Sequence, residues 1–283
     1  ALPLIARGLD REYGLTEEET AIFAASHAGE KFHIAALESI AEKAGLTEDM
    51  WIMKPTVPVS KAANEERIRE GKAPRKFYHN CAGKHAALII TQRALGGEIE
   101  DYWKLDSKVQ QEVLRTVALM SECREEDITV GIDGCGVPVF AVGMKNIAAA
   151  FKNLACLDTI KDEGLRRAAE TFVPRMNKYS HMIRGTGYLC SIINQDSNIV
   201  AKGGAAGVYG CGLKKERLGI SMKLADGCED VWPFILSEIF KAIGYENRET
   251  IEKLDALHGP NIYNDNDTLV GHWEPMFKVE IKR

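Results

Sequence analysis

The chain has 283 residues, of which 45% are hydrophobic, and it carries a formal net charge of −5. This length and composition indicate a globular protein with one large domain or two small ones. The charge gives no reason to expect nucleic acid or an anionic membrane as a partner, and no apolar run approaches the roughly 20 residues that a membrane span needs. The seven cysteines are an odd number spread over a long chain, which is untypical of a disulfide framework, so we predict a cytoplasmic location.

Helices are predicted throughout the first half of the chain. Thr16 and Glu19 form a capping box that begins the first of them, and Gly45 is a typical end for the second. Residues 54–76 are rich in proline and charge and lack apolar periodicity, so we expect a solvated surface loop, with a substrate lid as the alternative. Apolar residues at helical spacing predict further helices over residues 80–95, 106–120, 146–157 and 163–176.

Strands are predicted in the second half. Short apolar runs separated by brief turns predict strands over Tyr188–Asn194, Ile199–Lys202, Val208–Leu213, Leu218–Leu224 and Phe277–Lys282, with a helix over Val231–Ile243. The turns are too short for parallel crossovers, so the sheet should be antiparallel. No linker separates the two halves. We therefore predict an α+β fold in a single domain, residues 1–283, with a helical N-terminal half packed on a strand-rich C-terminal half and helices covering the sheet.

Residues 78–86 concentrate metal-ligating and nucleophilic side chains just before an apolar helix. Asn80 suits the N-cap position of this helix, which would place Cys81 and Lys84 in its first turn. Free backbone N–H groups and the helix dipole favour a thiolate over a thiol there. A helix that only fills the core has no need of these side chains, although Cys81 by itself could be a buried structural cysteine.

A second cysteine, Cys135, lies in a glycine-rich turn over residues 131–138. Cys81 and Cys135, with Lys84 or His85 as a third ligand, would give the layout of zinc sites that keep one position open for water or substrate. Lysine is a poor zinc ligand unless its pKa is strongly lowered. The spacing by itself leaves the third ligand open, and the pattern alone indicates that the remaining cysteines are core residues.

A further motif, Lys202-Gly203-Gly204, ends a predicted strand and is similar to the Lys-Thr/Ser-Gly element on the sheet edge of serine β-lactamases. Together with three earlier motifs it resembles, in order, the motifs of the rhizobial-type (asparaginase II-like, class 3) L-asparaginases. The four motifs are Ser26-His-Ala-Gly-Glu30, Cys81-Ala-Gly-Lys-His85, Gly131-Ile-Asp-Gly-Cys-Gly-Val-Pro138 and Lys202-Gly-Gly-Ala-Ala-Gly207. The resemblance covers essentially the whole chain and implies a serine β-lactamase/glutaminase-like fold and a homodimer.

The resemblance also implies roles for individual residues. A zinc ion would be held by three ligands, which are Cys81, Lys84 and Cys135. The predicted catalytic residues are Ser26, Lys202 and Asp133, and the predicted substrate-binding residues are His85, Cys190, Lys84 and again Asp133. Lys202 suits the α-carboxylate of an amino acid and Asp133 suits its α-ammonium group, whereas zinc would position the substrate rather than supply hydroxide.

The predicted reaction is hydrolysis of L-asparagine to L-aspartate and ammonia. The alternatives are a glutaminase or another amide hydrolase on the same fold, because one methylene is weakly discriminated, and a non-catalytic zinc-containing amino-acid-binding homologue. The family also carries a Ser-x-x-Lys pair that the match places before Ala1, so either the chain given lacks this segment or this homologue lacks the pair. We therefore expect Ser26 to need a partner from that segment, and residues 1–283 alone to hydrolyse asparagine poorly.

Overall fold

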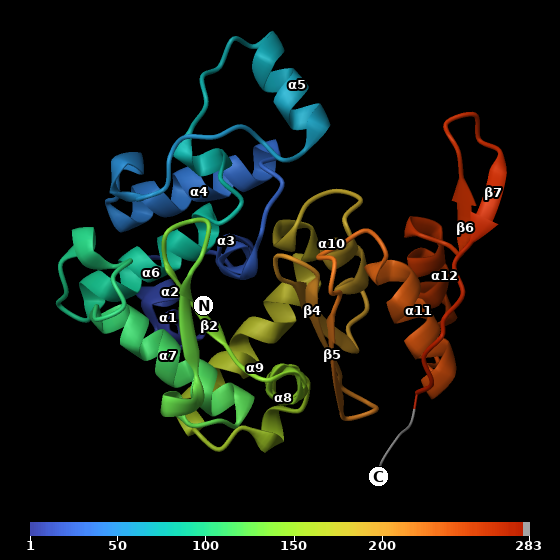
Figure 1. Cartoon of the computed structure of the whole chain (residues 1–283). Coiled ribbons are helices and arrows are strands. Elements are labelled where there is room, and N and C mark those ends of the chain that lie inside the picture. Colours follow the sequence, from blue (N-terminus) through green and yellow to red (C-terminus); the bar gives the residue numbers. More distant parts are fainter. Residues whose placement is uncertain (280–283) are drawn as a thin grey trace. The chain divides into compact units, whose positions relative to one another are not determined.

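The computed structural model describes residues 1–279 and is a mixed α+β structure dominated by helices (Figure 1). The α-helices are α1 (Leu2–Ala6), α2 (Leu9–Glu12), α3 (Glu17–Ala21), α4 (Lys31–Ala44), α5 (Lys61–Arg69), α6 (Ala82–Ala94), α7 (Lys108–Ser121), α8 (Met144–Ala155), α9 (Glu163–Lys178), α10 (Leu189–Ile193), α11 (Trp232–Ile243) and α12 (Arg248–Leu257). The strands are β1 (Thr129–Ile132), β2 (Pro138–Ala141), β3 (Ile199–Gly203), β4 (Val208–Leu213), β5 (Leu218–Lys223), β6 (Asn261–Tyr263) and β7 (Leu269–His272). The predicted α+β class is confirmed.

The chain divides into two compact units. Unit 1 contains residues 1–202 and 210–221, and unit 2 contains residues 203–209 and the chain from residue 222 onward. The candidate active-site and metal-binding residues all belong to unit 1. This division does not decide whether residues 1–283 form one domain, which stays a prediction.

Helix α6 lies at the centre of the helical part of unit 1, where it packs against α1, α4 and α7. Most of its residues are buried, including Ile89 and Ile90, which have no exposed surface. Leu37 and Ile40 of α4 are equally buried. Because α6 is covered on most sides, its apolar run is longer and more continuous than that of a surface helix.

Several helix boundaries follow from local signals that the sequence displays. The capping box is confirmed: Glu19 N donates to Thr16 Oγ1 at 3.1 Å, and Thr16 N donates to Glu19 Oε2 at 2.7 Å. Helix α4 ends at Gly45, which adopts the left-handed conformation. The N-cap of α6 is Cys81 and not Asn80. The prediction was wrong by one residue, because a 3₁₀ turn over residues 76–78 and the following loop carry the chain one position further before the helix begins.

Two predicted elements differ in the structure. Residues 61–69 form helix α5 within the expected loop, because Ser60 caps it, its side chain accepting a hydrogen bond from Ala63 N at 3.3 Å. The segment predicted as a strand over residues 188–194 contains helix α10. In that segment Asn194 Nδ2 donates to the Cys190 carbonyl at 2.7 Å, four residues back, and short apolar runs do not by themselves distinguish a strand from a buried helix.

The predicted strands over residues 199–202, 208–213 and 218–224 are confirmed as β3, β4 and β5, which form a sheet in that order. Hydrogen bonds from Gly204 N to Val208 O and from Lys214 N to Asn198 O run in antiparallel register. The predicted strand over residues 277–282 is not seen at residues 277–279, and its other residues lie outside the described part of the chain. Residues 277–279 pair with no other strand in the described residues, and an alternating sequence without such a partner does not form a strand.

Helix α8 packs on this sheet through glycines of β4. A Cβ atom at Gly212 would lie 2.1 Å from the Phe151 carbonyl oxygen, so only glycine permits this approach of helix and strand. The antiparallel hairpin β1–β2 pairs Thr129 with Ala141 and Ile132 with Pro138, and its turn carries residues 133–137 (Figure 1). No helix within residues 1–279 is both long enough and apolar enough to cross a membrane.

Candidate active site and metal centre

Ser26 lies in an extended segment between α3 and α4 and is fixed by its backbone. Ser26 N donates to the Ile183 carbonyl at 3.0 Å, and His27 N donates to the Asn80 carbonyl, also at 3.0 Å. The second bond places the residue after Ser26 beside the residue before Cys81. The Ser26 segment and the start of α6 are therefore joined by main-chain contacts.

Lys202, at the end of β3, reaches the Ser26 side chain. Its Nζ lies 3.0 Å from Ser26 Oγ, within hydrogen-bond distance. Both side chains are half-buried. Lys202 is thus adjacent to Ser26 in space although it lies 176 positions away in sequence.

Arg184 and Glu30 support the Ser26 segment; in the sequence, Glu30 is marked only as the end of the Ser26 motif, and Arg184 is not marked at all. Arg184 donates through Nη1 to the Ser26 carbonyl at 2.7 Å, and its own carbonyl accepts from Ala28 N at 2.7 Å. Glu30 accepts from both the backbone N–H and the hydroxyl of Thr186, at 2.8 and 2.7 Å. The glycines on either side of Thr186 were a signal in the sequence, since a polar residue between two glycines is typical of a functional loop.

The start of α6 comes close to the Ser26 segment because residue 83 is glycine. A Cβ atom at Gly83 would lie 2.2 Å from the Ile22 carbonyl oxygen. Trp51 holds the same turn from another side, where its Nε1 donates to the Ala82 carbonyl at 2.9 Å. Cys81 and Lys84 are therefore carried on a rigid helix start.

The turn of the β1–β2 hairpin brings a carboxylate and a thiol to this helix start. Asp133 N donates to the Val137 carbonyl and Gly136 N donates to the Asp133 carbonyl, both at 2.9 Å, which closes the turn. Asp133 Oδ1 accepts from Gly134 N at 2.8 Å. Cys135 is buried, and its Sγ lies 3.2 Å from Asp133 Oδ2.

Cys81, Asp133 and Cys135 form one cluster. A ligand atom from each lies within 4.8 Å of the other two. Cys81 and Cys135 therefore lie close together, and the structure adds Asp133, which is predicted from the sequence as a catalytic and substrate-binding residue. Two sulfur atoms with a nitrogen or oxygen donor are a ligand type that suits zinc.

The two thiols of this cluster titrate together. A hydrogen bond from the Cys81 thiol lowers the pKa of Cys135 to about 4, and the nearby His85 and Lys84 also favour its thiolate. The same hydrogen bond raises the pKa of Cys81. In the absence of a metal, the two sulfur atoms therefore hold one proton and one negative charge between them.

Lys84 pairs with the cluster as a cation. Its Nζ lies 2.8 Å from Asp133 Oδ2. Burial alone would lower the pKa of Lys84, but the negative charge of the Cys81–Cys135 pair and that of Asp133 raise it above its ordinary value. The same ion pair lowers the pKa of Asp133 although burial opposes this. Lys84 could coordinate a metal only after losing a proton that this cluster holds tightly.

His85 lies fully buried beneath the cluster. Its Nδ1 lies 2.7 Å from the Tyr102 hydroxyl, which itself accepts a hydrogen bond from Ile52 N at 3.0 Å. The Tyr102 hydroxyl and Nδ1 thus share one hydrogen bond, whose direction depends on the tautomer of the imidazole. Nε2 has no hydrogen bond of ordinary geometry among residues 1–279. Burial lowers the pKa of His85, and the nearby Cys135 opposes this effect.

Of the remaining predicted site residues, Cys190 lies buried in α10. The same helix is joined to β3 by Asn194, which exchanges hydrogen bonds with Ala201, the residue before Lys202. Cys190 is thus on an element that supports Lys202. The structure brings the predicted residues into two groups, Ser26 with Lys202, and Cys81, Lys84, His85, Asp133 and Cys135.

Both groups lie in segments that the four sequence motifs mark. A family model for L-asparaginase II matches residues 1–275 of the chain. The chain belongs to the L-asparaginase II family. A search of curated proteins finds no match. Membership of this family supports an amidohydrolase of the L-asparaginase type that acts on a small molecule, which agrees with a nucleophile candidate and a polar cluster on neighbouring segments.

Proposed function

We propose that the chain hydrolyses the side-chain amide of L-asparagine to L-aspartate and ammonia, with Ser26 as the nucleophile and Lys202 as its base. The observation that carries this proposal is the 3.0 Å approach of Lys202 Nζ to Ser26 Oγ in a member of the L-asparaginase II family. A serine hydroxyl needs such a partner because it is a weak nucleophile at its ordinary pKa. With Lys202 as that partner, this proposal replaces the expectation from the sequence that Ser26 depends on a segment before Ala1 and that residues 1–283 alone hydrolyse asparagine poorly.

The proposed reaction uses Lys202 twice. Unprotonated Nζ takes the proton of Ser26 as Oγ forms a bond to the amide carbon, and the carbonyl electron pair moves to oxygen. When the carbon–nitrogen bond breaks, the proton passes from Lys202 to the leaving nitrogen, which departs as ammonia. Water then attacks the ester on Ser26, Lys202 removes its proton, and L-aspartate is released as Ser26 recovers its hydrogen.

Arg184 holds the carbonyl of Ser26, so Oγ keeps its position relative to Lys202 during these steps. Asp133 offers a carboxylate of lowered pKa either to the α-ammonium group of the substrate or, as a third ligand, to the metal. We infer that Cys81 and Cys135 hold a zinc ion together with either Lys84 or Asp133. Bound zinc would supply a positive charge that fixes polar groups of the substrate, while the proton transfers belong to Ser26 and Lys202.

The proposal is tested by ammonia release from L-asparagine. Ser26→Ala and Lys202→Met should each lower kcat about 10²–10⁴-fold, which is the usual contribution of nucleophile activation and general-base assistance. Ser197→Ala and Lys223→Met, at exposed positions, are matched controls that should leave kcat unchanged. Full activity in Ser26→Ala would contradict the role of Ser26.

A second measurement does not need turnover. An L-asparagine analogue with a diazoketone in place of the side-chain amide should add one label per chain, and mass spectrometry of peptides should locate the label on Ser26. Lys202→Met should slow the labelling. A label at another residue, at the same rate in Ser26→Ala, would assign the nucleophile elsewhere.

Finer features of the family remain our proposals. The arrangement of Lys202 at the end of a β-strand next to Ser26 supports a serine β-lactamase/glutaminase-like fold. The preference for asparagine over glutamine is measured by the ratio of kcat/KM for the two amides, and we expect this ratio to be at least about ten. A cytoplasmic location and a homodimer remain predictions from the sequence.

A further inference from the structure

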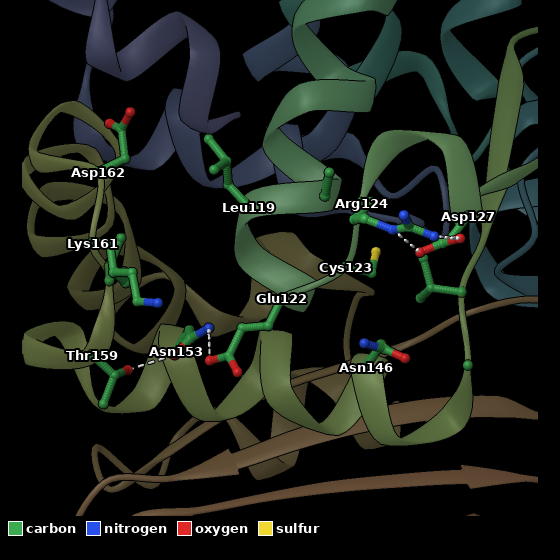
Figure 2. Close-up of a pocket in the computed structure, with 14 residues that line it drawn as sticks. Leu119, Glu122, Cys123, Arg124, Asp127, Asn146, Asn153, Thr159, Lys161 and Asp162 are labelled. Atoms are coloured by element: carbon green, nitrogen blue, oxygen red, sulfur yellow. Dashed lines mark hydrogen bonds and ion pairs between the residues drawn. The ribbon is translucent and has the colours of Figure 1, made fainter.

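A cavity of about 720 Å³ lies between the C-terminal end of α7, helix α8 and the segment before α9 (Figure 2). It lies in unit 1, and neither Ser26, Lys202 nor the two cysteines of the metal cluster line it. Sites for small molecules typically have volumes of about 300–1,000 Å³. The cavity therefore has room for a small molecule at a place distinct from the candidate active site.

One wall of the cavity presents a carboxylate that is held in place. Glu122 follows α7 in the left-handed conformation, at φ 54° and ψ 41°, which non-glycine residues rarely adopt. Its Oε1 accepts from Asn153 Nδ2 at 3.1 Å. Asn153 is 2% exposed, and it also donates to the Met120 carbonyl and accepts from Thr159 Oγ1. A fully engaged buried amide thus orients Glu122 (Figure 2).

The opposite wall presents an ammonium group. Lys161 extends its amino group toward the hollow, and it has no ion-pair partner among residues 1–279 (Figure 2). Arg124, the other cation of the lining, is already neutralised because two of its nitrogen atoms lie 2.8 and 2.9 Å from the Asp127 carboxylate. The positive charge that a ligand would meet in the cavity therefore comes from Lys161.

The balance of charges defines the class of ligand. Besides Glu122 the lining contains Asp162, one oxygen of which caps α9. With Arg124 and Asp127 neutralising each other, one positive and two negative charges face the cavity. A carboxylate on the ligand would pair with Lys161, and one or two ammonium groups would pair with the carboxylates. Leu119 offers an apolar surface to an aliphatic chain.

The cavity is also connected to the metal cluster through the β1–β2 hairpin. Asp127, two residues before β1, and the pair Val142–Gly143, directly after β2, line the cavity. The turn at the other end of the hairpin carries Asp133 and Cys135. A molecule in the cavity would therefore contact the base of the hairpin, next to both of its strands, while the turn at the opposite end belongs to the candidate site.

We propose that this cavity binds an α-amino acid with a neutral or basic side chain, and that the bound amino acid shifts the β1–β2 hairpin and its Asp133–Cys135 turn. The binding site stands on the cavity and its charges alone. The regulatory consequence rests on the function proposed for that turn. Because coupling between two sites is reciprocal, occupancy of the metal cluster should also change the affinity for the amino acid.

Titration calorimetry with L-lysine tests the binding, because L-lysine has no side-chain amide to be hydrolysed. Lys161→Met and Glu122→Gln should each weaken binding at least about tenfold, the scale of one charge-assisted hydrogen bond. Lys145→Met and Glu125→Gln, exposed charges outside the lining, should bind as the unaltered chain does.

Two ligands that each lack one charged group complete the test. Hexanoate has no ammonium group and 1,5-diaminopentane has no carboxylate, so each should bind at least about tenfold more weakly than L-lysine. Absence of L-lysine binding, equal binding by both variants, or equal binding of either simpler ligand would overturn the proposal. None of these results depends on asparagine hydrolysis, so they leave the proposed function untouched.

The coupling to the hairpin has its own measurement. Amide hydrogen exchange in residues 129–141 should slow when L-lysine binds the unaltered chain and should not change in Lys161→Met. If calorimetry shows binding while exchange in the hairpin stays the same, the cavity is a binding site without influence on the metal cluster, and the regulatory part of the proposal is wrong.

Discussion

At the residue scale, the Asp133 carboxylate lies beside both an ammonium group and a cysteine sulfur atom. Its Oδ2 lies 2.8 Å from Lys84 Nζ and 3.2 Å from Cys135 Sγ. A carboxylate beside a thiolate is unfavourable unless a positive charge lies between or beside them. Lys84 supplies that charge in the metal-free cluster, and a divalent cation would supply it more strongly.

The position of Asp133 between Lys84 and Cys135 gives a prediction about the third metal ligand. If Asp133 coordinates zinc, Asp133→Asn should weaken zinc binding by roughly 10–100-fold while Lys84→Met changes it little; if Lys84 coordinates, the ranking reverses. We expect Asp133→Asn to weaken zinc binding more than Lys84→Met does, because the cluster raises the pKa of Lys84 and so keeps it protonated. Competition with a chromogenic chelator measures the affinity. Lys104→Met, at an exposed lysine, is the control, and an equal effect of both variants would contradict a single third ligand.

His33 gives a prediction about acid stability. It is fully buried, and burial lowers its pKa from 6.5 to about 3. The unfolded chain therefore binds a proton below about pH 6.5 that the folded chain does not bind until about pH 3. Within that window the free energy of unfolding should fall by about 1.4 kcal/mol for each unit by which the pH is lowered, on account of His33.

The variant His33→Gln should remove this contribution without removing the helix cap, because glutamine at the same position can accept the hydrogen bond that Glu30 N donates to the imidazole. Urea unfolding at pH 7.5, 6 and 5 should show a shallower loss of stability in the variant. His272→Gln, at a histidine paired with Glu274 on the surface, should keep the original slope. Identical slopes for His33→Gln and the unaltered chain would show that His33 is not the group responsible.

At the element scale, the packing of α8 on β4 depends on the absence of side chains. Gly212→Ala would force a methyl group to within 2.1 Å of the Phe151 carbonyl oxygen. Helix and strand must then separate, and we expect a loss of about 2–3 kcal/mol in the free energy of unfolding. Gly204→Ala is the matched control, because its nearest neighbour is 3.5 Å away. Equal stability of the two variants in urea would contradict this packing.

Helix α5 shows the opposite situation, a helix without buried residues. Apart from an ion pair between Lys31 and Glu66 at its surface, local signals hold it, so Ser60→Ala should cost about 1 kcal/mol of local stability and leave the global urea midpoint unchanged. The measurable effect is limited trypsin cleavage after Lys61, Arg67 or Arg69, which should become about fivefold faster. Ser197→Ala should not change the rate, and an unchanged rate in Ser60→Ala would mean that tertiary contacts hold α5.

At the scale of the whole molecule, we expect a homodimer from the family to which the chain belongs. The hairpin β1–β2 adds support, because Ile132 is 80% exposed and Val139 is 48% exposed, and such apolar surfaces are often covered by a partner. Sedimentation velocity should give about twice the chain mass of 31.3 kDa. A mass of one chain that persists at concentrations of about 100 µM, where a dimer with Kd near 1 µM would be nearly complete, would contradict this.

The sequence by itself determined the features that depend on neighbouring residues. The Thr16 capping box and the Gly45 helix end are set within one helical turn, and the short apolar run over residues 208–213 marks β4. Four short motifs also identified the family, because each carries chemistry in a fixed local spacing. Where the local signal was ambiguous, as in residues 188–194, the choice between helix and strand needed the hydrogen bonds of Asn194.

The tertiary structure decided which of these pieces meet. No sequence pattern pairs Ser26 with Lys202, since their contact follows from the position of β3 relative to the segment that Ile183 and Arg184 hold. Likewise, Asp133 enters the cluster with Cys81 because the hairpin turn is placed against the start of α6. Such contacts depend on packing and on loop closure over long sequence separations, so they cannot be predicted from the residues that are adjacent in sequence.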